Sequence, residues 1–241
     1  MLQLDQAVDV RSDLAAPSTP APEALLRSRF GDLQLTIGSD LAALEAEWRR
    51  FEQVADCTVF QSFDWLSSWL RHVGSPNGVT PAIAVGRRGG QTACILPLGI
   101  EAQGGVRRLG FLGRELGDYN APLLAPGFAR LCGDFPALWR AIRGLLQAHP
   151  RYRHDLIVLD KMPELIGAQA NPLLQLKVNR NPSGAYAMQF GDAWETFYAA
   201  KRSSATRRRD RTKRKRLGEG GELRMVSPQT VEDIAHTLDL L

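Results

Sequence analysis

The chain has 241 residues and a formal net charge of +4, with 44% hydrophobic residues and five tryptophans. This composition can supply the buried core of one large domain or two small ones. Cys57, Cys94 and Cys132 are odd in number and far apart in the sequence, which argues against a disulfide framework and a thiolate metal site. We therefore expect a reducing compartment and no bound metal.

We find no membrane or secretory signal in the sequence. No apolar run approaches the roughly 18 residues that a membrane helix needs. Asp5, Asp9 and Asp13 interrupt the N-terminal segment and no basic leader precedes them, which argues against a signal peptide. We expect a cytoplasmic protein without a membrane span.

The positive charge is concentrated in one segment. Residues Lys201 to Arg216 include ten Lys or Arg and a single acid, Asp210, so their local charge is +9. Because the whole chain carries +4, the remaining residues sum to −5. The basic segment, and not the whole surface, therefore explains the high isoelectric point.

The composition divides the chain into three parts. Residues 1–30 are rich in Ala, Pro, Ser and acidic residues and predict a disordered leader. Residues 31–190 form a first lobe and residues 191–241 begin a second unit. The elements predicted in the first lobe are, in chain order, a strand at 33–37, helices at 41–51 and 63–73, strands at 81–85, 93–100 and 106–112, a helix at 135–148, a strand at 155–160, a weaker helix at 164–169, and short strands at 174–178 and 185–190. This order is typical of an α/β (α+β) lobe with a mixed central sheet flanked by helices.

Polar residues and glycine mark the ends of these helices. Ser39, Ser62 and Asp134 each precede a run of helical spacing and are predicted N-caps, since a short polar side chain there accepts a backbone N–H. Gly74 is expected to end the second helix.

The second unit is predicted to open with a helix. Asp192 and Glu195 have the spacing of a capping box, and the helix should continue through the basic segment to the glycines at 218–221. A strand at 223–226 and a helix opened by Ser227 should follow.

A polar loop at 114–120 follows the third apolar strand run, Val106 to Leu112. Ligand sites in α/β sheets favour such strand ends. Asp118, Tyr119 and Asn120 are therefore candidate substrate-binding residues. The alternative is an ordinary loop whose Asp and Asn satisfy their own backbone.

Several short motifs together resemble one family. They are, in chain order, VFQSFDWLSSWL (Val59 to Leu70), ILPLGI (Ile95 to Ile100), RRLGFLG (Arg107 to Gly113), GDYNAPLL (Gly117 to Leu124), HDLIVLDKMP (His154 to Pro163), NPLL (Asn171 to Leu174), and a W-x-x-(F/Y) helix that runs into a basic K/R-x-x-R-R stretch. The series resembles the cellulose-biosynthesis-type (CelD-like) acetyltransferases of the GNAT superfamily, which are related to the Fem-type aminoacyl transferases. The similarity covers roughly residues 30 to 241.

This resemblance implies an acyl-CoA-dependent acyltransferase, a probable N-acetyltransferase of the kind associated with cellulose or exopolysaccharide biosynthesis. Acetyl-CoA would be the co-substrate, and the acceptor would be a small or glycan-related molecule. In the family two GNAT-like lobes pack together and the second generally carries the acyl-CoA site. We expect this sequence to cover the first lobe and only the opening of the second, and to be inactive by itself. Gln61 matches a family position and is a fourth candidate substrate-binding residue, whereas Trp65 is expected in the core.

GNAT enzymes commonly cradle the CoA pyrophosphate on backbone N–H groups in the pattern R/Q-x-x-G-x-G/A. Two segments approach this pattern, RELGDY (114–119) and RLCGDF (130–135). Each ends in a bulky residue, Tyr119 or Phe135, where the pattern requires Gly or Ala. We expect degenerate or ordinary turns, and hence weak or no acetyl-CoA binding.

No catalytic residue is predicted. A nucleophile elbow and a His/Cys pairing are both missing from the sequence, and a GNAT reaction would need neither. His149 and His154, with the adjacent Asp155, are expected in a solvated loop because their spacing fits no metal site.

The basic segment has two interpretations. Ten cations could neutralise nucleic-acid phosphates. We favour a solvated, charge-rich helix, because the segment has no aromatic residues and its charges lie on all helical faces. The functional alternatives to an acyltransferase are a non-catalytic binding module on a degenerate lobe and a Fem-type aminoacyl transferase associated with tRNA.

Overall fold

The computed structural model describes residues 25–179, 181, 184, 188, 191–222 and 224–240. They fall into two compact units, one that ends at Asn179 and one that begins at Arg180. We call them the sheet unit and the helical unit and describe each by itself. The division falls earlier than the boundary expected after residue 190.

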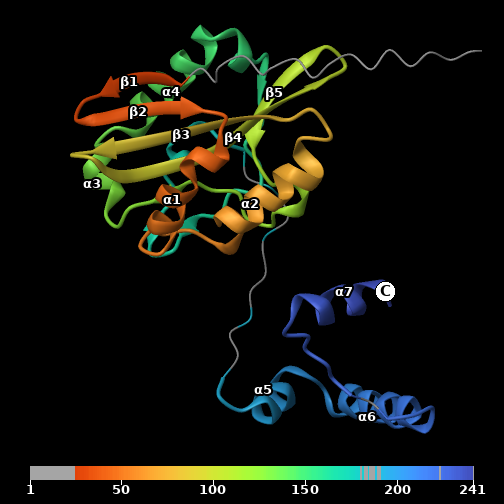
Figure 1. Ribbon diagram of the computed structural model, residues 1–241. Helices are drawn as coiled ribbons and strands as arrows, with labels where there is room; N and C mark the ends of the chain where they lie inside the picture. The colour runs from red at the N-terminus through yellow and green to blue at the C-terminus, as the bar shows by residue number, and fades with distance from the viewer. Residues whose placement is uncertain are drawn as a thin grey trace, which may run out of the picture. The chain divides into compact units, whose positions relative to one another are not determined.

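The sheet unit is built on one mixed sheet with helices on both faces (Figure 1). Its strands are β1 (Leu26–Phe30), β2 (Leu33–Gly38), β3 (Thr80–Arg88), β4 (Gln91–Gln103), β5 (Val106–Phe111), β6 (Leu123–Leu124) and β7 (Leu156–Ile157). The order across the sheet is β1-β2-β3-β4-β5-β7, and β6 pairs with β4. All pairs are antiparallel except β5 with β7, which is parallel. The expected fold class is confirmed.

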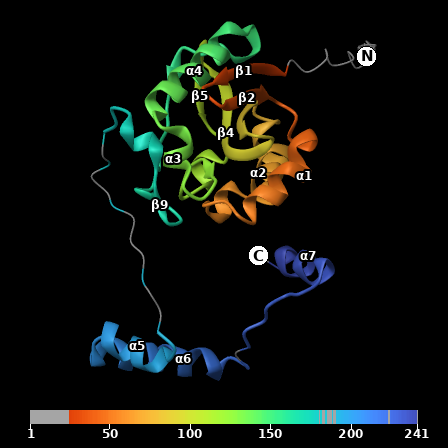
Figure 2. The same ribbon diagram turned by 90° about the vertical axis from the view of Figure 1, so that its left-hand side faces the viewer.

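Four helices cover the sheet. They are α1 (Leu41–Glu52), α2 (Phe63–Trp69), α3 (Phe128–Cys132) and α4 (Phe135–Ala148). Helices α1 and α2 bury their apolar positions in one hydrophobic cluster, and α3 and α4 bury theirs in another on the opposite face. Figure 2 shows α4 beside β1 and β2, with which it is in contact. Short helical turns complete the unit at η1 (Val59–Gln61), η2 (Leu70–Gly74), η3 (Arg114–Leu116), η4 (Pro150–Tyr152) and η5 (Pro172–Gln175).

The strand pattern explains why the sheet is buried on both faces. In β3, Ile83 and Val85 point into the cluster of α1, while Ala82 and Ala84 point into that of α4. In β4 every residue from 93 to 100 is buried, which fits a central strand. The strands predicted at 81–85, 93–100 and 106–112 are confirmed as β3, β4 and β5.

Several details of the sheet unit differ from expectation. Asp40, not Ser39, caps α1, because its carboxylate accepts the Ala43 N–H at 3.0 Å. Ser62 and Asp134 cap α2 and α4 as expected. Residues 26–30 form β1, whose alternate side chains pack toward the core, so the sheet begins before the expected end of the leader.

The segment after β7 also differs. The strand expected at 155–160 is only β7, two residues long, and the helix expected at 164–169 is a hairpin of β8 (Leu165–Ile166) and β9 (Gln169–Ala170). Gly167, at φ +55°, makes the hairpin turn that a helix cannot contain. Residues 174–178 include the end of η5 and no strand. Most of the strand expected at 185–190 lies outside the described residues.

The helical unit contains α5 (Trp194–Lys201), α6 (Ser204–Glu219) and α7 (Val231–Asp239). The single helix expected from Asp192 onward is interrupted, because Arg202 is extended and Ser203 caps a new helix by accepting the Thr206 N–H. The predicted capping box is wrong: the N-cap is Ala193, without a side-chain bond. Described residues 224–226 form no strand. Thr230, not Ser227, caps α7.

Within the described part of the chain, the helices are all too short or too polar to cross a bilayer.

Candidate functional site

The loop at 114–120 follows the carboxyl end of β5, which pairs in parallel with β7. It begins with the turn η3, whose N-cap Gly113 has φ +85°. Arg114 follows with φ +41°, and its guanidinium forms an ion pair with Glu101 of β4. The loop is therefore attached to the sheet at its first residue.

Gln61 joins this loop to the start of α2. Its Nε2 donates to the Tyr119 carbonyl oxygen at 2.6 Å, across 58 residues of sequence. Its Oε1 accepts from the Thr58 N–H at 3.0 Å and from the Thr58 hydroxyl at 2.9 Å. Gln61 is buried, with 2% of its surface exposed. The structure thus brings two predicted site segments together, but the amide of Gln61 is occupied by protein groups.

Asn120 and Lys161 hold the other side of the loop. The buried Asn120 amide donates to the carbonyl and carboxylate oxygens of Asp160, both at 3.3 Å. The Lys161 ammonium donates to the carbonyl oxygens of Glu115, at 2.9 Å, and Gly117, at 3.0 Å. Lys161 was not among the predicted site residues, although it comes directly after the strand predicted at 155–160. Asn120 therefore positions the loop and presents no free amide to a ligand.

Two predicted residues remain accessible. Asp118 is exposed and Tyr119 is half-buried. The Tyr119 ring packs against Phe60 with their centroids 6.2 Å apart, and Phe60 in turn meets the edge of Trp65 at 5.4 Å. Trp65 packs on the α1–α2 cluster as expected. We call Asp118, Tyr119 and Phe60 the acidic-aromatic surface.

Several N–H groups in and beside the two candidate phosphate loops are already bonded to protein groups. In the first, the Leu116 N–H donates to Gly113 and the Gly117 N–H donates to Arg114, at 3.0 and 3.2 Å. The Asn120 N–H donates to Lys161 at 3.0 Å. A pyrophosphate would have to displace these bonds.

In the second candidate phosphate loop, at 130–135, a backbone hydrogen bond and a capping carboxylate both stand against phosphate binding. The Gly133 N–H donates to Ala129 at 3.1 Å, and the Asp134 carboxylate accepts the Ala137 N–H at 2.9 Å. A carboxylate already occupies the N-terminus of α4, so a second anion would meet like charge.

The cysteines have the properties of inert thiols. Burial raises the pKa of Cys94 to about 12 and that of Cys132 to about 11. Burial, together with the charges of Glu52 and Asp56, also raises the pKa of Cys57. Because the thiolate is the nucleophile, none of the three is activated for attack on a thioester.

The histidines differ from the solvated loop that was expected. His154 is 7% exposed, its Nδ1 lies 3.1 Å from the Tyr152 carbonyl oxygen, and its Nε2 has no partner among the described residues. His149 begins η4 and lies against the Tyr152 ring, with centroids 5.4 Å apart. The turn η4 folds Tyr152 into the core, which draws His154 inward. In the described residues, no three His, Cys, Asp or Glu side chains are grouped to hold a metal ion.

Comparisons with protein-family models, with curated proteins and with solved structures find no match to this chain.

Proposed function

We propose that the chain is part of an acyl-CoA-dependent acyltransferase resembling the cellulose-biosynthesis-type (CelD-like) members of the GNAT superfamily, and that its sheet unit faces the acceptor. The observation that carries the proposal is the position of the acidic-aromatic surface. Its Asp118 and Tyr119 lie on a loop at the carboxyl end of β5 that Gln61 and Lys161 hold in place, next to the only parallel strand pair described in the sheet. In parallel α/β sheets, ligand sites favour the carboxyl ends of the strands, and the loop lies at this end of the β5–β7 pair.

The chemistry of the surface suits an amine- or hydroxyl-bearing acceptor. Asp118 is an exposed carboxylate that can bind a protonated amine or accept a hydroxyl hydrogen bond. The rings of Tyr119 and Phe60 offer a flat apolar surface on which the apolar face of a sugar ring can pack. Gln61, Asn120 and the Lys161 ammonium would keep the loop in place while the acceptor binds.

The co-substrate under this proposal is acetyl-CoA. In the turns at 114–119 and 130–135, N–H groups that a pyrophosphate would need are already bonded to protein carbonyls. We therefore assign the binding of the pyrophosphate to a second lobe, of which residues 191–241 would be the beginning. The same hydrogen-bonded N–H groups also favour the alternative function, a non-catalytic binding module. The tRNA-associated alternative has only the charge of α6 in its favour.

The proposal is tested on the chain extended through its second lobe, by release of free CoA from acetyl-CoA in the presence of amine and amino-sugar acceptors. We expect the variant Asp118→Asn to raise the KM for the acceptor by about tenfold, the loss of one charged hydrogen bond. Glu115→Gln is the matched control, since it neutralises an exposed carboxylate of the same loop.

Two results would contradict the proposal. Equal acceptor KM values for the two variants would remove the acidic-aromatic surface from acceptor binding. Acceptor binding without any release of CoA would favour the non-catalytic module.

A further inference from the structure

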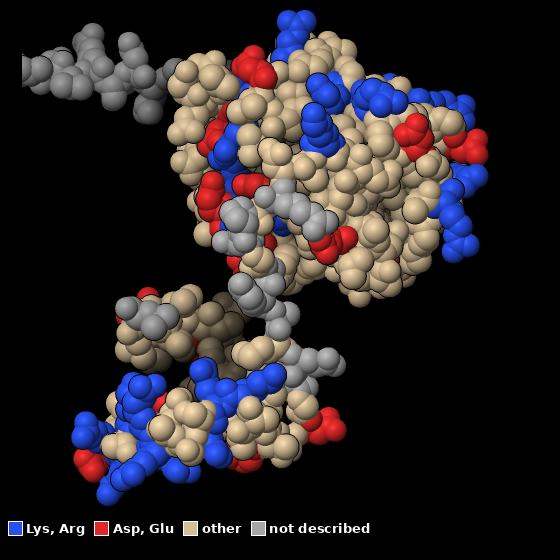
Figure 3. All heavy atoms as spheres, turned by 180° about the vertical axis from the view of Figure 1, so that it is seen from behind, with Lys and Arg blue, Asp and Glu red and all other residues tan. Residues whose placement is uncertain are grey.

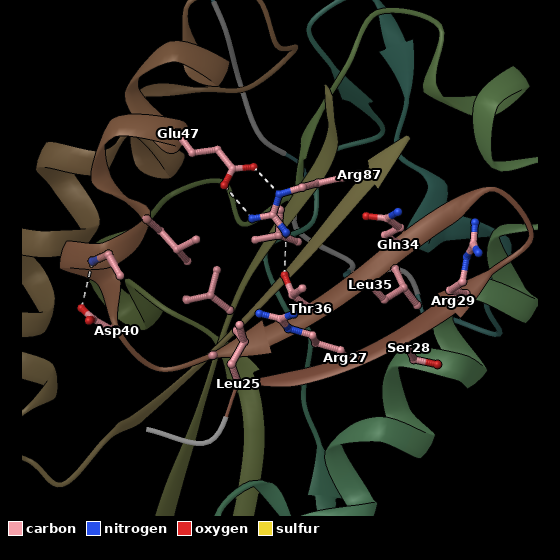
Figure 4. A pocket seen from close by; sticks show the side chains of 15 residues that line it. Leu25, Arg27, Ser28, Arg29, Gln34, Leu35, Thr36, Asp40, Glu47 and Arg87 are labelled. Atoms are coloured by element: carbon pink, nitrogen blue, oxygen red, sulfur yellow. Dashed lines mark hydrogen bonds and ion pairs between the residues drawn. The ribbon is translucent and has the colours of Figure 1, made fainter. Parts of the chain in front are cut away.

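A groove of about 740 Å³ lies on the α1 side of the sheet, between α1 and the outer strands β1, β2 and β3 (Figure 4). It is separate from the loop at 114–120, which contributes none of its lining residues. Its volume falls within the range of small-molecule sites, which is about 300–1,000 Å³.

Two arginines stand along the outer strand of the groove. Arg27 and Arg29 are exposed and two positions apart, so they project from the same face of β1. The strand register places Arg27 opposite Thr36 and Arg29 opposite Gln34. Among the described residues, neither guanidinium has an ion pair or a hydrogen bond. The outer wall of the groove therefore carries two uncompensated positive charges beside polar groups.

The acidic residues of the groove are already occupied. Glu47 of α1 binds Arg87 through both oxygens, at 2.7 and 2.6 Å, and accepts the Thr92 hydroxyl at 2.5 Å. Arg87 also donates to the Thr36 hydroxyl at 2.8 Å. Asp40 is engaged as the cap of α1. Because these carboxylates have their own partners, they leave Arg27 and Arg29 available to a ligand.

The floor of the groove is apolar. Ile83 and Val85 of β3 are almost completely buried beneath it, and the half-buried Leu44 of α1 forms part of the inner wall. A ligand that filled the groove would thus place an apolar body on β3 and α1 and a charged group at β1. Guanidinium groups bind carboxylates in a paired geometry, which favours an anion over a neutral head group.

We propose that this groove is a binding site for a small amphipathic monoanion, a carboxylate on an apolar body, whose carboxylate is bound by Arg27 and Arg29. The proposal does not depend on the acyltransferase function, because none of the residues that line the groove belongs to the acidic-aromatic surface.

The test uses decanoate as the probe and isothermal titration calorimetry on the full chain, below the concentration at which decanoate forms micelles. We expect the double variant Arg27→Gln/Arg29→Gln to weaken decanoate binding by about tenfold or more. The matched control is Arg140→Gln/Arg143→Gln, which removes two exposed arginines from α4 and changes the net charge equally. It should bind decanoate as the unmodified chain does.

A second variant tests the volume of the groove. Ala43 is exposed in the first turn of α1 and lines the groove, so Ala43→Phe should fill part of it without disturbing the core. We expect this variant to weaken decanoate binding while both arginines remain. Equal affinity of the double variant and its control, unchanged binding in Ala43→Phe, or equal affinity for decanoate and 1-decanol would each overturn the proposal.

Discussion

Glu47 shows how one carboxylate can connect a helix to a sheet. Burial alone would raise its pKa, but hydrogen bonds from Arg87 and Thr92 and the nearby positive charges outweigh burial and hold the pKa below its ordinary value of 4.5. The unfolded chain therefore binds more protons at this group than the folded chain does in mildly acidic solution. It follows that the stability from Glu47 is present above pH 4.5 and is lost as the pH falls through the folded pKa.

We predict that Glu47→Gln lowers the free energy of unfolding at neutral pH by about 1.5–3 kcal/mol, the range for hydrogen bonds to charged groups. The difference from the unmodified chain should shrink as the pH falls below 4.5. Urea denaturation of both chains at several pH values measures this difference in the free energy of unfolding. Glu45→Gln is the control, because Glu45 pairs with Arg49 at the surface and should matter little. A constant difference at all pH values would contradict the role of the charge.

At Gly167 a side chain is unfavourable for two separate reasons, the backbone conformation and the space around the residue. Its φ is +55°, and a Cβ there would overlap the Asp56 carboxylate. That carboxylate accepts from the Ala168 N–H at 3.2 Å and from the Gln169 amide at 2.6 Å, which fixes the β8–β9 hairpin to the segment after α1.

We predict that Gly167→Ala destabilises the chain by about 3 kcal/mol, from backbone strain and from displacement of Asp56. Gly89 has nearly the same φ, +56°, and open space around it, so Gly89→Ala should show the strain alone, about 1 kcal/mol. Chemical denaturation of both variants compares the two costs. Equal losses would mean that Asp56 moves aside without penalty.

At the scale of elements, the central strands and several caps could be predicted from local pattern. The run 93–100 is buried at every position, and Ser62 and Asp134 accept backbone N–H groups within their own turns. The break between α5 and α6 could not be predicted in this way. Ser203 lies in a segment of good helix formers, and the hydrogen bond by which it caps α6 competes with continuation of the α5 helix through this point.

The candidate site was predictable only in part. Strand-end position and residue type indicated Asp118 and Tyr119, which are accessible. The roles of Gln61 and Asn120 depend on contacts with residues 58 and 40 positions away, which no local pattern contains. Lys161 likewise acts through its position beside the loop, so its residue type alone gave no signal.

Helix α6 has charge on every side, and Asp210, the single acid among residues 201–216, is engaged. Lys and Arg side chains crowd the surface of the helical unit (Figure 3). The Tyr198 hydroxyl of α5 donates to Asp210 at 2.5 Å, which joins the two helices and raises the pKa of the tyrosine. The exposed cations have no aromatic residues between them along the helix, so they lack a surface for stacking bases.

We predict that any nucleic-acid binding by α6 is electrostatic and independent of sequence. The logarithm of the association constant should fall linearly with the logarithm of salt concentration, by about 0.9 for each phosphate neutralised on duplex DNA. Fluorescence anisotropy with duplexes and single strands of different sequence, across a salt series, measures this. Binding that survives high salt, or that prefers one sequence, would contradict the prediction.

At the scale of the whole molecule, the two units differ in how they bury their residues. Every buried residue described lies at or before Leu173, whereas none of the described side chains of α5, α6 and α7 is buried. Most helical stability in proteins comes from packing of an apolar face, and isolated helices shorter than about 12–15 residues are marginal in water. Repulsion among the cations of α6 adds to this cost.

We predict that amides of α5 to α7 exchange with solvent far faster than those of β3 to β5 in hydrogen-exchange mass spectrometry. The informative comparison is α6 with α1, because α6 has 16 residues and α1 has 12, yet only α1 buries side chains, Leu41, Trp48 and Phe51. If length and propensity governed protection, α6 would be the slower of the two. If burial governs it, α1 should exchange slowly, with the strands, and α6 should open locally at little free-energy cost. Protection of α6 equal to that of α1 would mean that the helical unit is stabilised by interactions other than its own core.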